Sequence, residues 1–292
     1  LRYLETPAAY YCHEPPRALH ENAWQSHATR YERLRQSWRA PLERQLARRL
    51  AAEDTSLVRA ASAVLTNSRY TQSRILSIYG VNATVCPPGV HTPEVDDAVP
   101  ADSTYVLSVG ALEPHKAFDF LIDALSLIPA ATRPALHVVA NDQNAGYRRV
   151  LQRKARAAGV ELSIRFRIPD TELAREYAGA ALFVFAAHDE PLGLSPLEAM
   201  SHGLAVLAVG EGGVRETVDD GVTGILTPRS PQYFAQRLYE LLDSREYARQ
   251  LGMRGRQRVQ NDWSWQARGA CLASHLEQIA QGAGREQVRL TR

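Results

Sequence analysis

Residues Leu182 to Met200 read LFVFAAHDEPLGLSPLEAM. This stretch opens with an unbroken apolar run, passes through a polar segment containing Gly and Pro, and ends in residues that favour a helix. A continuous apolar run of this length is typical of a strand buried on both faces of a parallel sheet. Ligands of such sheets bind beyond the carboxyl ends of the strands. We therefore predict a βα unit with a ligand near the loop of residues 188–194.

Two glutamates of this stretch, Glu190 and Glu198, each allow two interpretations. Ser195 and Glu198 have the S-x-x-E spacing of a capping box, with Pro196 at the first helical position, which gives Glu198 a structural role. Alternatively Glu198 contacts a ligand, because the free amides of a helix N-terminus attract phosphate whatever the cap does. Glu190 precedes a proline in the loop, so it is either a ligand contact or an exposed acid.

The same alternation of short apolar runs and helix-like segments continues along the chain, as in parallel βα units. The predicted strands are residues 9–12, 63–66, 105–109, 136–140, 163–166, 182–185 and 205–209. Helical periodicity covers residues 118–128 and 147–158. Residues 87–100 are rich in Pro, Asp and Glu and form the best linker candidate. The region after this linker holds enough units for a complete Rossmann-like lobe, and the region before it holds about half of one.

Two further glycine-containing loops follow predicted strands. In GALEPHK, Gly110 to Lys116, the lysine either meets a diphosphate as a point charge or is a solvated residue of a first helical turn. In GEGGVRE, Gly210 to Glu216, Arg215 replaces the third glycine of a dinucleotide fingerprint. The glycine pair in this loop allows either a close approach to a ligand or a flexible turn.

The segment YCHEPPR, Tyr11 to Arg17, ends the first predicted strand. His13 could exchange a proton with a sugar hydroxyl or simply be a packed residue, and Arg17 could hold an anionic group. The basic segment 30–49 is predicted to be helical. It is either a solvated face or a peripheral contact with anionic lipid head groups or a lipid diphosphate.

Composition excludes several classes of function. The chain of 292 residues carries 34 Lys+Arg against 32 Asp+Glu, so no overall field recruits nucleic acid. Its three cysteines lack the spacing of a zinc site or a disulfide framework, and we expect a cytoplasmic protein. No apolar run reaches the roughly 20 residues that span a bilayer. No D-x-D pair, P-loop or G-x-S-x-G motif is present. The first residue is Leu1, which suggests that preceding residues were left out.

Taken in order, G-A-L-E-P-H-K, E-P-L-G-L-S-P-L-E and G-G-V-R-E resemble the carboxyl-terminal lobe of the retaining GT-B glycosyltransferases of family 4, glycosyltransferase group 1. The stretch DWSW, Asp262 to Trp265, is similar to the point where the family's final helix crosses back to the first lobe. Upstream, Y-C-H-E-P-P-R, T-N-S-R-Y and C-P-P-G-V resemble the second half of the amino-terminal lobe, especially in mannosyltransferase-like members.

This resemblance implies an α/β fold of the GT-B type with two Rossmann-like lobes, the amino-terminal one incomplete. Residues 1–91 would form the second half of the acceptor-side lobe, residues 92–262 the nucleotide-sugar-binding lobe, and residues 263–292 the returning helix. The implied reaction transfers a hexose from a nucleotide diphosphate sugar to a saccharide or lipid-linked acceptor, with retention of configuration and without a metal or other cofactor. A nucleotide-sugar-binding protein without turnover is the alternative.

The resemblance also implies roles for individual residues. The implied catalytic residues are His13, Lys116 and Glu190. The donor would be bound by Gly110, Lys116, Glu190, Gly193, Leu194, Ser195 and Glu198. Within this set, Glu198 would bind the ribose hydroxyls, Glu190 the sugar, and Lys116 with the amides near Gly193 the diphosphate. Arg17 would be an anion or acceptor contact. Ala111 stands where many members carry an arginine, which leaves more of the diphosphate to Lys116.

Overall fold

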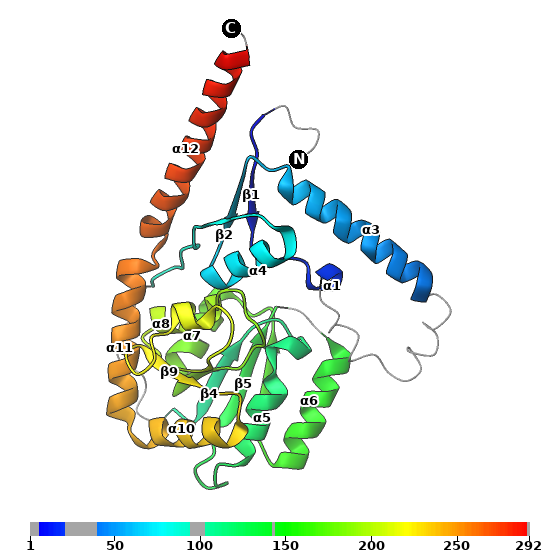
Figure 1. The fold of residues 1–292 in the computed structure, drawn as a ribbon. Helices are drawn as coiled ribbons and strands as arrows, with labels where there is room; N and C mark the ends of the chain where they lie inside the picture. The colour runs from blue at the N-terminus through cyan, green and yellow to red at the C-terminus, as the bar shows by residue number, and fades with distance from the viewer. Residues whose placement is uncertain (1–5, 21–39, 94–102, 142–143, 291–292) are drawn as a thin grey trace. The chain divides into compact units, whose positions relative to one another are not determined.

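A computed structural model describes residues 6–20, 40–93, 103–141 and 144–290 (Figure 1). The chain forms two compact units. One unit comprises residues 1–87 and 269–292, and the other comprises residues 88–268. The three-part domain division expected from the sequence stays a prediction.

The first unit contains a parallel sheet with strand order β1-β2-β3. Its strands are β1 Ala9–Cys12, β2 Ala63–Thr66 and β3 Thr84–Val85. Its helices are α1 Arg17–His20, α3 Ala40–Arg59 and α4 Arg69–Tyr79, joined by most of α12 Trp265–Leu290. The core gathers around Ile75 and Tyr79, which are fully buried. The sequence predicted β1 and β2 at these bounds but not the two-residue β3.

The second unit is built on a six-stranded parallel sheet with the order β6-β5-β4-β7-β8-β9. The strands are β4 Tyr105–Val109, β5 Ala135–Ala140, β6 Leu162–Phe166, β7 Leu182–Phe185, β8 Val206–Val209 and β9 Gly224–Thr227. The chain starts in the middle with β4, adds strands outward to β6, and returns to place β7 on the other side of β4. The position between β4 and β7 is therefore a topological switch point, where open α/β sheets bind ligands.

Helices pack on both faces of this sheet. They are η2 Pro114–Lys116, α5 Phe118–Ser126, α6 Ala145–Ala158, α7 Asp170–Gly179, α8 Leu194–Ser201, α9 Val214–Thr217, α10 Pro231–Asp243 and α11 Arg245–Asp262. One apolar core joins alternate strand residues to α5, α6 and α10, and the other joins the opposite set to α7 and α8 (Figure 1). The predicted Rossmann-like sheet is thus confirmed.

Helix α8 begins two residues earlier than the capping box predicted. Gly193 is the N-cap residue, with φ 89° and ψ 62°, and no side chain caps the helix. A left-handed backbone here suits glycine, because a Cβ would be strained in that conformation. Ser195 and Pro196 lie inside the first turn, so the prediction that they start the helix is wrong.

The basic segment 30–49 is only partly described. Residues 21–39 lie outside the described residues, and α3 starts at Ala40. Arg48 and Arg49 on α3 are exposed, as are the neighbouring Leu46 and Leu50. None of the described helices combines the length and the apolar character needed to cross a membrane.

Candidate functional site

The loops that leave β4 and β7 meet at the topological switch point. The backbone amide of His188 donates to the carbonyl of His115 at 2.7 Å. Beside this bond, Lys116 Nζ lies 2.6 Å from Glu190 Oε2, and the two side chains are only 18% and 16% exposed. A lysine and a glutamate that are 74 positions apart in sequence therefore form a largely buried ion pair across the switch point. We call this end of the sheet the switch-point edge.

Lys116 is placed by the turn that carries it. It ends the short 3-10 helix η2, and Ala117 follows in the left-handed region, at φ 52°, before α5 begins. The side chain runs along Gly110, where an added methyl group would lie 3.6 Å from Lys116 Cδ. The solvated first-turn interpretation of Lys116 is wrong, since the lysine precedes α5 and its ammonium is paired.

The glycine pair of the loop after β8 packs against the loop that carries Glu190. Gly213 donates its amide to the Glu190 carbonyl at 2.7 Å. A Cβ on Gly212 would lie 2.5 Å from the Glu190 carbonyl oxygen, and one on Gly213 would lie 2.1 Å from that of Pro191. Real Cβ atoms do not approach this closely. The glycine pair thus lies in close contact with a neighbouring loop, and this contact fixes the backbone of Glu190. The approach of this pair to a ligand stays a prediction.

Arg229 helps to hold the loops of the switch-point edge together, and the sequence analysis did not predict it. Its guanidinium donates to the carbonyls of Ala186 and Ala187, at 2.9 and 3.1 Å, and pairs with the Glu211 carboxylate at 2.6 Å. It thereby ties the end of β7 to the loop after β8. Burial and the nearby Arg229 charge lower the pKa of His188, so this histidine is neutral at pH 7. No motif marks Arg229, which follows a strand that was itself not predicted.

Glu198 projects from α8 and is half-buried. Its Oε2 accepts a hydrogen bond from the hydroxyl of Tyr177 at 3.1 Å. Burial raises the pKa of Glu198, and the hydrogen bond from Tyr177 only partly opposes this effect. No side chain caps α8, so the capping-box role predicted for Ser195 and Glu198 is wrong.

The N-terminus of α8 supplies backbone donors at the same edge. The first amides of an α-helix have no acceptor within the helix, and the helix dipole makes this end positive. In α8 these positions are occupied by the N-cap Gly193, which is buried, and by Leu194 and Ser195. Such an end is suited to bind a phosphate or carboxylate.

The remaining predicted residues, His13 and Arg17, lie in the other unit, just after β1. The ring of His13 is exposed, and its carbonyl accepts a hydrogen bond from Asn67 Nδ2 at 2.9 Å. The guanidinium of Arg17 is paired with the carboxylate of Glu14. The roles of His13 and Arg17 stay predictions.

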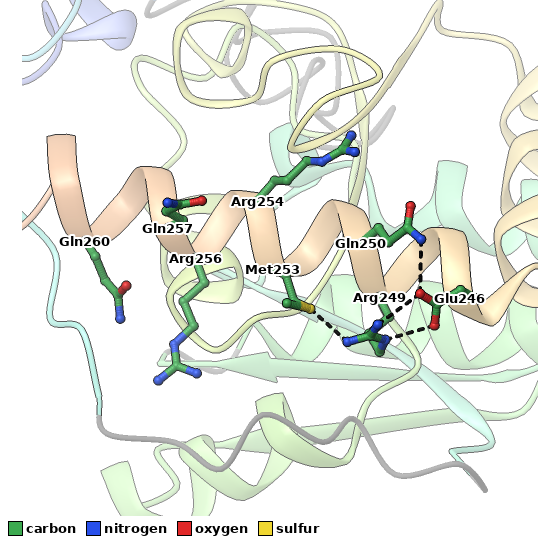
Figure 2. A pocket seen from close by; sticks show the side chains of 8 residues that line it. All are labelled: Glu246, Arg249, Gln250, Met253, Arg254, Arg256, Gln257 and Gln260. Carbon is green, nitrogen blue, oxygen red and sulfur yellow. Dashed lines mark hydrogen bonds and ion pairs between the residues drawn. The ribbon is translucent and has the colours of Figure 1, made fainter.

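An open hollow of about 600 Å³ lies elsewhere, along α11 (Figure 2). It is lined by Glu246, Arg249, Gln250, Met253, Arg254, Arg256, Gln257 and Gln260. Three of these residues contact one another within the helix: Arg249 Nη2 lies 2.9 Å from Glu246 Oε1, and Gln250 Nε2 lies 3.0 Å from the same oxygen. None of the predicted site residues lines this hollow.

Comparison with known proteins agrees with the geometry of the second unit. The family described as glycosyl transferases group 1 matches residues 94–258. The chain is 32% identical, over 76% of its length, to a GDP-mannose-dependent alpha-(1-6)-phosphatidylinositol monomannoside mannosyltransferase of Mycolicibacterium smegmatis. It is 30% identical, over 73% of its length, to a D-inositol 3-phosphate glycosyltransferase of Geodermatophilus obscurus. The chain covers 62% and 52% of these two relatives.

Solved structures share the fold. Sucrose-phosphate synthase from Thermosynechococcus elongatus superposes with a TM-score of 0.71 at 25% identity, covering 80% of this chain and 62% of the synthase. Anabaena HepE in complex with UDP-glucose gives a TM-score of 0.74 at 20% identity, covering 93% of this chain and 72% of HepE. The α/β architecture is therefore that of GT-B glycosyltransferases. With the family match covering more than half of its residues, the chain belongs to the glycosyl transferases group 1.

Proposed function

We propose that the switch-point edge binds the nucleotide diphosphate sugar from which this protein transfers a hexose to a saccharide or lipid-linked acceptor, with retention of anomeric configuration. The observation that carries the proposal is the Lys116–Glu190 pair, 2.6 Å apart and largely buried, on the two loops that flank the switch point. A largely buried cation beside a carboxylate is suited to a ligand that carries a negative charge in one part and hydroxyl groups in the next.

The donor's parts match the groups at this edge. Lys116 is a compact cation for the diphosphate, and the amides of Leu194 and Ser195 add neutral donors with the helix dipole behind them. Glu190, paired with Lys116, takes the sugar hydroxyls next to that diphosphate. Glu198, four residues beyond Leu194 on α8, takes the ribose hydroxyls at the other end of the donor.

The proposed reaction uses this arrangement. The bond between the anomeric carbon and the diphosphate oxygen breaks, and its electron pair leaves with the nucleoside diphosphate. Lys116 and the α8 amides stabilise that developing charge from positions fixed beforehand, which is an effective form of transition-state stabilisation. The acceptor oxygen bonds to the anomeric carbon on the face that the diphosphate leaves, and its proton passes to the departing phosphate.

The names of the relatives supply the first substrates to test. The Mycolicibacterium smegmatis relative is named for GDP-mannose and for a phosphatidylinositol mannoside acceptor, and HepE was solved with UDP-glucose. We propose a nucleotide-activated hexose donor, with GDP-mannose as the first candidate, and an inositol-containing or lipid-linked acceptor. We also propose that no metal takes part. Addition of EDTA should then leave the transfer rate unchanged, and loss of transfer that Mg²⁺ or Mn²⁺ restores would contradict this.

Calorimetric titration of the chain with GDP-, UDP- and ADP-sugars tests the proposal. We expect one-to-one binding of one of these donors, in competition with the matching nucleoside diphosphate. Binding of none of them would overturn the donor site. Donor binding without transfer to any saccharide or lipid-linked acceptor would favour a nucleotide-sugar-binding protein without turnover.

A further inference from the structure

The ring of Tyr177 is held in one place beneath α8. Tyr177 lies near the end of α7 and is 2% exposed. Its ring is nearly parallel to the imidazole of His202, with centroids 4.8 Å and planes 14° apart, and it also packs against Phe183. A ring enclosed in this way has little rotational freedom, so the direction of its hydroxyl is fixed.

The hydroxyl of Tyr177 holds one oxygen of Glu198. It donates to Oε2 at 3.1 Å, and a buried phenol needs such a partner. Within the part of the chain that the structure describes, the other oxygen, Oε1, accepts no hydrogen bond. The carboxylate is thus anchored at one oxygen and keeps the acceptor capacity of the other.

The charges around Glu198 make this anchor important. Burial raises the pKa of Glu198, while donation from Tyr177 favours the ionised form. Burial and the Glu198 charge together raise the pKa of Tyr177 well above its usual value, so the phenol remains a donor. Behind it, burial lowers the pKa of His202 to about 4, assisted by His91 and Arg256, so that this imidazole is neutral at pH 7. The groups facing Glu198 therefore offer it a hydrogen bond rather than a cation.

We propose that Tyr177 is a positioning residue of the donor site: its hydroxyl fixes Oε2 of Glu198 and thereby presents Oε1 to the ribose hydroxyls of the donor. This inference rests on the proposed function. Tyr177 acts through Glu198 and does not itself touch the ligand. A carboxylate that is held in place loses less conformational entropy when it binds two vicinal hydroxyls.

The test compares Tyr177→Phe with the unaltered chain, using nucleoside diphosphate titrations from pH 5 to pH 8.5. Phenylalanine keeps the buried ring, so we expect the fold to be retained. At pH 7.5 we expect about tenfold weaker binding, the size of one hydrogen bond to a charged group. We also expect the pH below which affinity is lost to move upward. In a Glu198→Gln background the same change should have no further effect.

Tyr105→Phe is the matched control, because Tyr105 donates to a backbone carbonyl, that of Glu176, at 2.9 Å. It should leave both affinity and pH profile unchanged. A purely structural role for Tyr177 predicts the same loss at every pH and in both backgrounds, and that result would overturn the inference. If Tyr177→Phe does not fold, 3-fluorotyrosine at position 177 keeps the ring and strengthens the donor. It should lower the pH below which nucleotide affinity is lost. If that pH does not change, the inference is also overturned.

The failure of this inference can be distinguished from that of the proposed function. Absence of nucleoside diphosphate binding by the unaltered chain overturns both together. Normal binding by the unaltered chain, with Tyr177→Phe matching it in affinity and pH profile, overturns the role of Tyr177 alone.

Discussion

The switch-point edge and the hollow along α11 differ in what holds their charged groups. At the switch-point edge, Lys116 and Glu190 come from loops after different strands and pair at 2.6 Å with less than one-fifth of either side chain exposed. In the hollow, Arg249 pairs with Glu246 three positions away on the same helix (Figure 2). Both side chains of this pair are about half exposed or more. The hollow has volume, but this ion pair lies within a single helix and is open to solvent. A site is therefore better identified by the convergence of several elements than by empty space.

The largest expected effect comes from breaking the backbone contact that fixes Glu190. Gly213→Ala would place a Cβ 2.1 Å from the carbonyl oxygen of Pro191, so the loops must move apart. We expect the free energy of unfolding to fall by about 3 kcal/mol, at the upper end of overpacking costs, and donor binding to be lost. Denaturant unfolding and donor titration measure the two effects.

Gly269→Ala is the control for that change, since nothing lies within 4 Å of its added methyl group on α12. Alanine at a helix position of this kind should stabilise by roughly 0.5–1 kcal/mol. Equal stabilities for the two variants would show that the close approach of the loops is not required.

A second effect compares two lysines with the same pairing distance. Lys116→Met removes the cation at the switch-point edge, and Lys154→Met removes one paired with Asp123, also at 2.6 Å, on α6 and α5. We expect roughly 30- to 100-fold weaker binding of the nucleoside diphosphate for Lys116→Met, which corresponds to about 2–3 kcal/mol. Lys154→Met should bind normally. Similar affinities in both variants would place the diphosphate elsewhere.

A third change, Glu198→Gln, should affect the stability of the fold and the binding of nucleotide in opposite directions. Because burial raises the pKa of Glu198 in the folded state, its ionisation costs stability. The contribution of the protonated carboxyl to the free energy of unfolding is fully present below the usual glutamate pKa. It is lost as the pH rises through the raised pKa of the folded state. Glu198→Gln should therefore be more stable than the unaltered chain at pH 8, equally stable at pH 4, and weak in nucleotide binding. Unfolding curves at both pH values check the sign, and lower stability at pH 8 would refute it.

The smallest effect is expected in the hollow. Arg249→Ala removes an exposed ion pair on α11, and exposed pairs of this spacing contribute little. We expect no measurable change in the thermal unfolding midpoint or in donor affinity. A tenfold loss of affinity in this variant would make the hollow part of the site.

Most of the sheet could be predicted from the sequence because its strands are buried on both faces and appear as continuous apolar runs, as Leu182–Phe185 does. Strand β9 was missed because Gly224 opens it and polar residues bound it, so it has no such run. The start of α8 was misplaced because Ser195, Pro196 and Glu198 fit a capping box, whereas the left-handed Gly193 actually begins the helix.

The candidate site was predictable as a set of residue types but not as a set of contacts. Lys116 and Glu190 each follow a strand, and their pairing depends on β4 and β7 being neighbours, which no local pattern reveals. Tyr177 and Arg229 carry no motif, because one acts through a buried hydrogen bond and the other through carbonyls of a distant loop. Such residues become visible only when the chain is folded.

A crystal structure of this chain with the nucleoside diphosphate that it binds in solution would locate the donor site directly. We expect the diphosphate within hydrogen-bonding distance of Lys116 Nζ and of the first amides of α8, with the ribose at Glu198. Density for the nucleotide in the hollow along α11, or anywhere away from the loops after β4 and β7, would contradict this expectation.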